Sequence, residues 1–249
     1  MTLETLKQVA RKTIVVCLII MTLLLALSIY TGTSPPFVVV DGRSMQHTDQ
    51  SAIGVIDAGD IVLLQANARI TTYVEGRSIG YLTYGDYGDV LVFKHPVFGL
   101  VIHRAIMYVR LNGTGYDVPG LKVFNVTEVR IDGMGWKRDL SITFQLDKLG
   151  NELGNEEGYI TMGDRNAYGG GYDLWIVKSE YVLGRARGEI PYMGLVPLVA
   201  RGQLVWGDGS VPSNSWLGLN VTLSIVVTSI LVTILFGSLK NRRERWLGK

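Results

Sequence analysis

A serine, a histidine and two aspartates stand in short motifs along the middle of the chain. Ser44 lies in Gly-Arg-Ser-Met, directly after a strand-like run over Phe37–Val40, and His103 lies in Val-Ile-His-Arg, a strand pattern with a polar pair at its centre. A serine hydroxyl becomes a strong nucleophile only when a base removes its proton, and the ordinary pKa of histidine suits that task near neutral pH. Ser44 and His103 are therefore the candidates for a nucleophile and its general base.

Two aspartates could complete such a site. Asp164 ends the strand-like run Tyr-Ile-Thr-Met-Gly-Asp, and Asp173 follows a glycine run at residues 169–171. A carboxylate beside the histidine fixes its tautomer and stabilises the imidazolium that forms during attack. Either aspartate could instead cap a turn, and the residues alone leave that choice open.

Each candidate also has a structural interpretation. A serine in a turn and a histidine in a strand are more often structural than catalytic when each is taken singly. The other histidines have weaker claims, because His47 is too close to Ser44 in sequence to be held opposite it, and His95 precedes a proline in a turn. A Ser–Lys dyad that uses Lys94 ranks behind, since a lysine base must be strongly desolvated to be neutral.

Composition argues against several other kinds of site. Cys17 is the only cysteine and lies in an apolar run near the start of the chain, so the rest of the protein has neither a disulfide nor a thiol nucleophile. Three histidines without a cysteine partner argue against zinc, and no metal or organic cofactor is expected. The central segment has no basic run interleaved with aromatic residues, so nucleic acid is not an expected partner.

Two uncharged apolar runs flank the segment that carries these motifs. They cover residues 14–30 and 216–239, and about 20 helical residues cross a bilayer core of about 30 Å. Basic residues precede the first run and follow the second, so the positive-inside rule places residues 1–13 and the basic tail 240–249 in the cytoplasm. We expect a two-span protein of the cell membrane, with residues 31–215 on the extracytoplasmic face. A cleaved signal peptide is the alternative for the first run, but that run is longer than usual.

The segment between the two apolar runs has the pattern of an antiparallel β domain. Its short alternating or β-branched runs are separated by Gly, Asn, Asp or Pro, and no helical periodicity of useful length occurs among them. Residues 111–157 are richer in charge and turn residues. They are predicted to form an inserted lobe, and none of their features is assigned to the chemistry. Sequons at Asn112 and Asn125 are weak glycosylation signals. The predicted strands are Phe37–Val40, Asp60–Leu64, Asp89–Phe93, Val101–Arg110, Lys122–Ile131, Ser141–Leu146, Tyr159–Met162 and Tyr181–Ile190.

The order of the motifs resembles that of the type I signal peptidases. Gly-x-Ser-Met at Ser44 is followed by Gly88–Phe93, Val101–Arg104 and Tyr159–Asp164, and Gly184–Gly194 resembles the closing block of the archaeal and endoplasmic-reticulum branch, in which histidine replaces the lysine base. The resemblance implies a signal-peptidase-like β fold and a membrane-bound serine endopeptidase that removes N-terminal signal peptides from exported preproteins.

The same resemblance implies roles for the four candidates. Ser44 would be the nucleophile, His103 the general base, Asp173 the third member of the triad and Asp164 a supporting residue. The implied partners are preprotein signal peptides, the lipid bilayer and the secretion translocon.

This sequence departs from the family pattern in three places. His47 stands where a proline is expected, Gly42 stands where a serine is often found, and the interval between Asp164 and Asp173 is longer than usual. A catalytically inactive membrane subunit of the same fold is the alternative function. The presence of Ser44, His103 and both aspartates together argues against that alternative.

Overall fold

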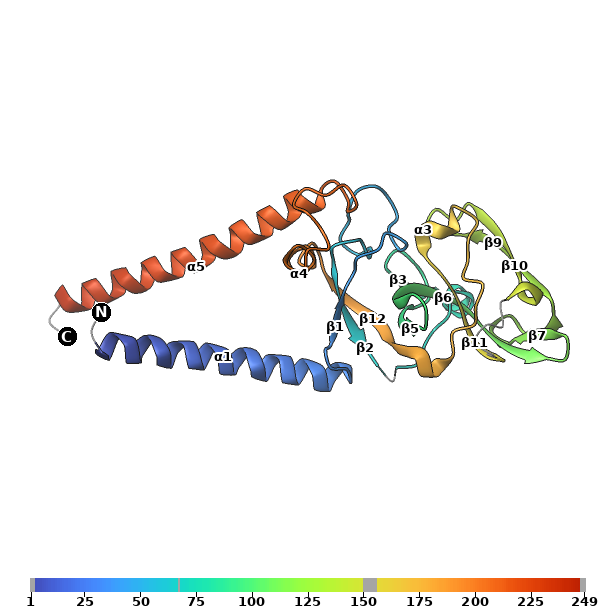
Figure 1. Cartoon of the computed structure of the whole chain (residues 1–249), viewed down its shortest axis with the longest axis horizontal. Coiled ribbons are helices and arrows are strands. Elements are labelled where there is room, and N and C mark those ends of the chain that lie inside the picture. The colour runs from blue at the N-terminus through green and yellow to red at the C-terminus, as the bar shows by residue number, and fades with distance from the viewer. Residues whose placement is uncertain (1–2, 67, 150–155, 247–249) are drawn as a thin grey trace.

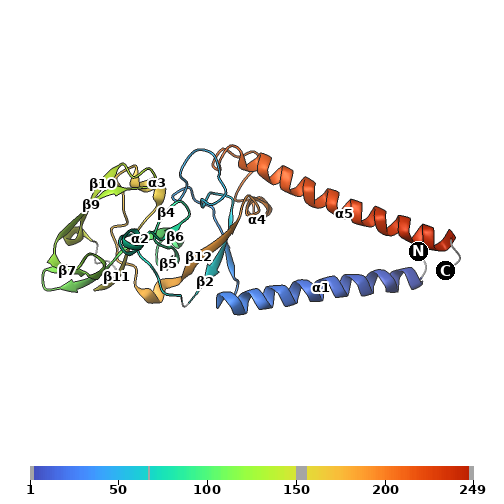
Figure 2. The ribbon, with the colours of Figure 1, turned by 180° about the vertical axis from the view of Figure 1, so that it is seen from behind.

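Two long helices and a β domain make up the protein. The computed structural model describes residues 3–66, 68–149 and 156–246, so the expectations for residues 150–155 of the lobe and 247–249 of the tail lie outside the described residues. Helix α1 (Leu3–Thr31) and helix α5 (Ser215–Trp246) both extend away from the same end of the β domain (Figures 1 and 2).

Both helices are long and apolar enough to span a membrane. The apolar parts are Ala10–Thr31, with a mean hydropathy of 2.7, and Ser215–Gly237, with a mean hydropathy of 2.3. Side chains on all sides of these helices, such as Leu18 and Ile230, are more than half exposed. Because water is a poor solvent for a helix that is apolar all round, lipid is the surrounding that suits these two segments.

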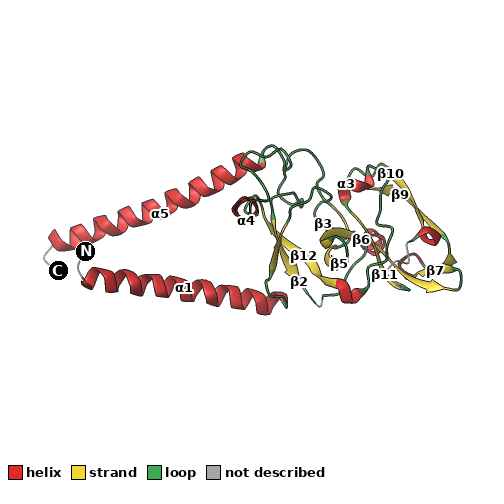
Figure 3. Cartoon of the chain, in the orientation of Figure 1, coloured by secondary structure: helices red, strands yellow, loops and turns green. Residues whose placement is uncertain are grey.

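The β domain is built around one antiparallel sheet, as predicted from the sequence (Figure 3). The strands follow the order β1-β2-β12-β5-β6-β7-β8, and β11 pairs with β6 beside that path. Their bounds are β1 Phe37–Val39, β2 Ile61–Gln65, β5 Val90–His95, β6 Gly99–Asn112, β7 Gly115–Val118, β8 Val123–Val126, β11 Glu157–Met162 and β12 Val182–Ile190.

Strand β6 is the longest and has different partners along its length. Its first half pairs with β5 on one edge, whereas its second half pairs with β11 on the other, from Arg104 to Arg110. On the β11 side, residues 99–103 therefore have no strand beside them among the described residues. Strand β1 stands at the end of the sheet and likewise has one free edge within the part of the chain that the structure describes.

The inserted lobe contains a separate hairpin. Strands β9 (Glu128–Met134) and β10 (Leu140–Gln145) pair only with each other within the described residues. The prediction of a single strand over Lys122–Ile131 was wrong, because β8 and β9 belong to different sheets. The carbonyl of Thr127, between them, accepts hydrogen bonds from the N–H groups of Leu146 and Asp147 in the turn after β10, and not from a neighbouring strand.

Three short helices occur in the β domain, although the sequence predicted none outside the apolar runs. They are α2 (Tyr73–Ile79), α3 (Asp164–Ala167) and α4 (Leu195–Ala200), and a two-strand pair, β3 (Leu82–Thr83) with β4 (Asp86–Tyr87), follows α2. Each helix has fewer than eight residues, which is too short for a periodic apolar pattern to be recognised. Helix α2 does begin with a capping box formed by Thr72 and Glu75.

Candidate active site

Ser44 occupies the centre of a tight turn that follows β1. The N–H of Gln46 donates to the carbonyl of Arg43 over 3.2 Å, which leaves Ser44 and Met45 at the two central positions. The Met45 side chain is buried in a core cluster with Val40, and it anchors the turn to the sheet. Ser44 itself is half-buried and remains accessible at the surface of the turn.

The Ser44 turn is packed against the start of α3. The N–H of Arg165 donates to the carbonyl of Ser44 over 2.8 Å. A Cβ atom added to Gly163 would lie 2.6 Å from that carbonyl oxygen and 2.9 Å from the Ser44 Cβ. Gly163 has φ −70° and ψ 136°, a conformation that any residue adopts, so glycine is required here for space and not for backbone freedom.

Replacing Gly163 with alanine should therefore displace Ser44. We expect Gly163→Ala to lower kcat of any reaction that uses the Ser44 hydroxyl by about 100-fold, since a misplacement of about 1 Å has that effect on a positioned group. Gly169→Ala is the matched control, because the nearest atom to its added Cβ would be 3.5 Å away. Equal activity of the two variants, measured with the same substrate, would contradict the packing argument.

His103 and Asp173 are directly hydrogen-bonded. The distance from His103 Nδ1 to Asp173 Oδ2 is 2.6 Å, and both side chains are at least nine-tenths buried. Asp173 also accepts a hydrogen bond from the Thr161 hydroxyl, and its own N–H donates to the Thr161 carbonyl over 3.0 Å. Because an ionised carboxylate only accepts hydrogen bonds, the proton belongs on Nδ1, and Nε2 is left as the basic atom of His103.

The end of β11 lies near both the Ser44 turn and the His103–Asp173 pair. Met162 pairs with Arg104 in the last position of the β11–β6 register, so Gly163 and His103 are each one residue beyond that pair. A Cβ added to Gly163 would clash with Ser44, so the Ser44 turn also lies against the residue that follows β11. Within the described residues, no hydrogen bond joins Ser44 directly to His103.

Asp164 lies in a different cluster. Its two oxygens accept hydrogen bonds from Nε and Nη2 of Arg104 over 2.8 and 2.6 Å, and His47 Nε2 lies 2.9 Å from Oδ2. Arg104 is almost completely buried, and its Nη1 donates to the backbone carbonyls of Thr83 and Gly88. Burial alone would raise the pKa of Asp164, but the charge and hydrogen bonds of Arg104, followed by those of His47, outweigh it and lower that pKa.

The two aspartates are separated because His103 and Arg104 are consecutive in one strand. Successive side chains in a strand point to opposite faces of the sheet. Asp173 therefore meets the histidine on one face, and Asp164 meets the arginine on the other. The arginine and its partners join β6 to the start of α3 on the face opposite to the His103–Asp173 pair.

A cavity of about 610 Å³ opens beside Ser44. It lies between β1 and the first residues of β6, the two strands whose facing edges have no strand partner among the described residues. Its walls are mainly apolar and include Phe37, Val39 and Ile102, while Arg201 and Gln203 stand at one end. An extended chain could hydrogen-bond to these free edges and place its apolar or small side chains in the cavity.

The other histidine and lysine candidates have structural surroundings. Lys94 is exposed on β5, whereas a lysine base needs to be desolvated. His95 is buried against the rings of Phe98 and Trp175, and its Nδ1 accepts hydrogen bonds from the β5–β6 turn. Within the described residues, no group of three or more His, Cys, Asp or Glu side chains is arranged to hold a metal ion.

Sequence reasoning missed three residues that support the site. His47 is linked to Asp164, although it was set aside as too close to Ser44 in sequence to be held opposite it. Trp136 stacks on His47, although no residue of the lobe was assigned to the chemistry. Arg104 was noticed only as half of a polar pair, and that pair in the middle of a buried strand was the one signal available. No spacing rule connects His47 or Trp136 with Asp164.

Comparison with known proteins gives no information about the function, so the function is inferred from the geometry of the site. No protein-family model matches this sequence, and no curated protein sequence matches it.

Proposed function

We propose that the protein is a membrane-bound serine endopeptidase of the signal-peptidase type, which removes N-terminal signal peptides from exported preproteins. The observation that supports the proposal is the buried, hydrogen-bonded pair of His103 and Asp173, together with a cavity of about 610 Å³ that is lined by Ser44 and by Ile102, the residue before His103. The motif order described above supports the signal-peptidase character of the fold.

In this proposal the three residues divide the chemistry as a serine triad does. His103 Nε2 removes the proton of Ser44 Oγ while that oxygen attacks the scissile carbonyl, and Asp173 stabilises the resulting imidazolium. His103 then donates the proton to the leaving amine, and water hydrolyses the acyl-serine in a second step with the same base. In the same proposal, the backbone N–H of Ser44 supplies part of the oxyanion hole.

The cavity supports an extended peptide as the substrate. Free strand edges on both β1 and residues 99–103 can each hydrogen-bond to a main chain laid between them. The apolar walls of the cavity suit small or aliphatic side chains near the cut, which is the pattern at signal-peptide cleavage sites.

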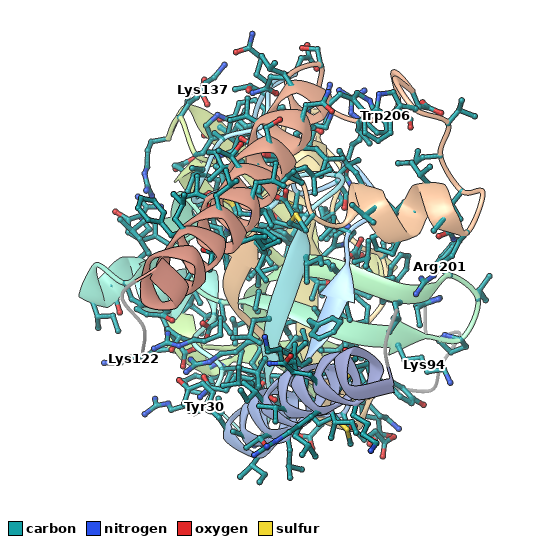
Figure 4. All side chains as sticks on the ribbon, turned by 90° about the vertical axis from the view of Figure 1, so that its left-hand side faces the viewer. Tyr30, Lys94, Lys122, Lys137, Arg201 and Trp206 are labelled. Carbon is teal, nitrogen blue, oxygen red and sulfur yellow. The ribbon has the colours of Figure 1, made fainter. Side chains whose placement is uncertain are left out.

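Exposed apolar residues near the start of α5 support a position against the bilayer. The Trp206 ring packs at a tilt against Trp216 in the first turn of α5, and Trp206 is about half exposed. Ile53 is 81% exposed in the loop that follows Ser44, and Ser51 of that loop is hydrogen-bonded to Asn214 just before α5. Seen from the free ends of the helices, Trp206 lies at the rim of the β domain (Figure 4).

This position implies an arrangement in the cell membrane. Tryptophan is enriched at the level of the lipid headgroups, so Trp206 and the start of α5 would mark the bilayer surface. The basic flanks of both apolar runs then put both chain ends in the cytoplasm and the β domain on the extracytoplasmic face, where the translocon delivers preproteins.

Cleavage of a precursor by the purified full-length protein in detergent tests the proposal. A precursor with an apolar signal segment and small residues at the cut should yield one shortened product, whose new N-terminus is read by mass spectrometry. The matched control carries tryptophan in place of the small residue before the cut and should stay intact. No cleavage of either precursor, or equal cleavage of both, would argue against a signal peptidase.

A further inference from the structure

The hairpin β9–β10 of the inserted lobe reaches the Ser44 turn through one aromatic stack. Trp136, in the turn between the two strands, lies parallel to the His47 ring, with 4.4 Å between ring centroids and 5° between planes. A Cβ added to Gly85 would lie 2.8 Å from the His47 Cε1 atom, so the backbone at Gly85 also approaches the ring closely. The imidazole thus has two segments packed near it, and its side chain is 9% exposed.

The hairpin turn is itself fastened to α3. The Trp136 ring packs on the ring of Tyr168, the residue that caps the end of α3, with centroids 4.1 Å apart. The N–H of Lys137 donates to the Tyr168 hydroxyl over 3.0 Å, and that hydroxyl lies 3.1 Å from an Asp139 carboxylate oxygen. Trp136 therefore sits between His47 on one side and α3 on the other.

His47 closes a small ring of contacts around the nucleophile. The Ser44 carbonyl is held by the N–H of Arg165, and His47, three residues after Ser44, is held by the carboxylate of Asp164. Both ends of the segment 44–47 are thus attached to the first turn of α3. The orientation of the imidazole decides whether the second attachment can form, and Trp136 fixes that orientation.

We infer that Trp136 and His47 are positioning residues for Ser44, and that the lobe hairpin acts as a clamp on the nucleophile turn. The inference rests on the proposed role of Ser44 for its kinetic consequence. The clamp itself concerns only how rigidly the segment 44–47 is held, and this rigidity can be measured without catalysis. Neither side chain touches the scissile bond in this account, and each acts through the placement of the serine.

Amide hydrogen exchange and cleavage kinetics of the full-length protein test the clamp together. In Trp136→Ala, exchange in the peptide that contains residues 42–48 should become about tenfold faster, because local opening loses its restraint. At the same time kcat should fall about tenfold with KM within about twofold of wild type, because the cavity is unchanged and only the alignment of Ser44 suffers. Trp136→Phe should restore both values, since a phenyl ring can still stack on His47.

Two controls separate the clamp from general destabilisation and from the proposed function. Phe124→Ala removes an exposed aromatic from the same lobe and should change neither value. Amides of β6 and β11 should keep their protection in Trp136→Ala. Unchanged exchange in residues 42–48 of Trp136→Ala, or an equal loss of protection throughout the domain, would overturn the clamp. If Ser44→Ala cleaves as fast as wild type, the proposed function fails, while the exchange data still decide on the clamp.

Discussion

Replacement of Asp173 by asparagine should lower the kcat of precursor cleavage by about 10⁴-fold and leave the melting temperature nearly unchanged. The side chain keeps its size, so Thr161 and the surrounding loop can retain their packing. An amide, however, can present its NH₂ group to His103 Nδ1, which favours the tautomer with the proton on Nε2. The histidine would then face Ser44 with a donor and could not accept its proton.

The kcat of Asp173→Asn and its melting temperature are measured on the same sample. A large loss of kcat without a change in melting temperature would agree with a role in orienting the base. Near-normal turnover of Asp173→Asn would mean that His103 does not depend on this carboxylate, and the assignment of the triad would have to be changed.

Replacement of Asp164 by asparagine should have its main effect on stability. Arg104 is buried, and without the carboxylate its charge would have no ionic partner of comparable geometry. Removing one member of a buried pair costs about 3–5 kcal/mol, which corresponds to roughly 10 °C in the melting temperature of a domain of this size. Asp132→Asn breaks the exposed pair with Arg130 and should leave the melting temperature unchanged.

The pH dependence provides a second check on Asp164. Its pKa is lowered in the folded protein, so its contribution to stability is present above the ordinary carboxyl pKa and disappears as the pH falls through the lowered value. The difference in melting temperature between wild type and Asp164→Asn should therefore be largest near neutral pH and shrink in acid. A difference that grows in acid would contradict the pairing with Arg104.

The sequence indicated the main pattern of the fold because the pattern is local. Strands β5, β6 and β11 contain β-branched residues and are bounded by turn residues, and the two apolar helices are much longer than the other α-helices among the described residues. The division of Lys122–Ile131 between two sheets could not be foreseen. It depends on which strand edge is free in three dimensions, and the sequence run itself is continuous.

The sequence also could not show which of the two aspartates lies beside His103. Both follow the same strand, and only the alternation of His103 and Arg104 across β6, together with the register of β11, places each acid on its own face. His47 illustrates the reverse case, because its closeness to Ser44 in sequence concealed a contact with Asp164, which is 117 residues away in the sequence. Long-range contacts of this kind carry no local signature.

Cleavage of the signal-bearing precursor by Ser44→Ala, compared with wild type at equal concentration in the same detergent, tests the central claim most directly. The substitution removes one oxygen from a half-buried turn, so the variant should melt at the wild-type temperature. We expect the wild type to release the shortened product and Ser44→Ala to release none above background, because members of a triad act as a unit. Product formation by folded Ser44→Ala at the wild-type rate would contradict the assignment of Ser44 as the nucleophile.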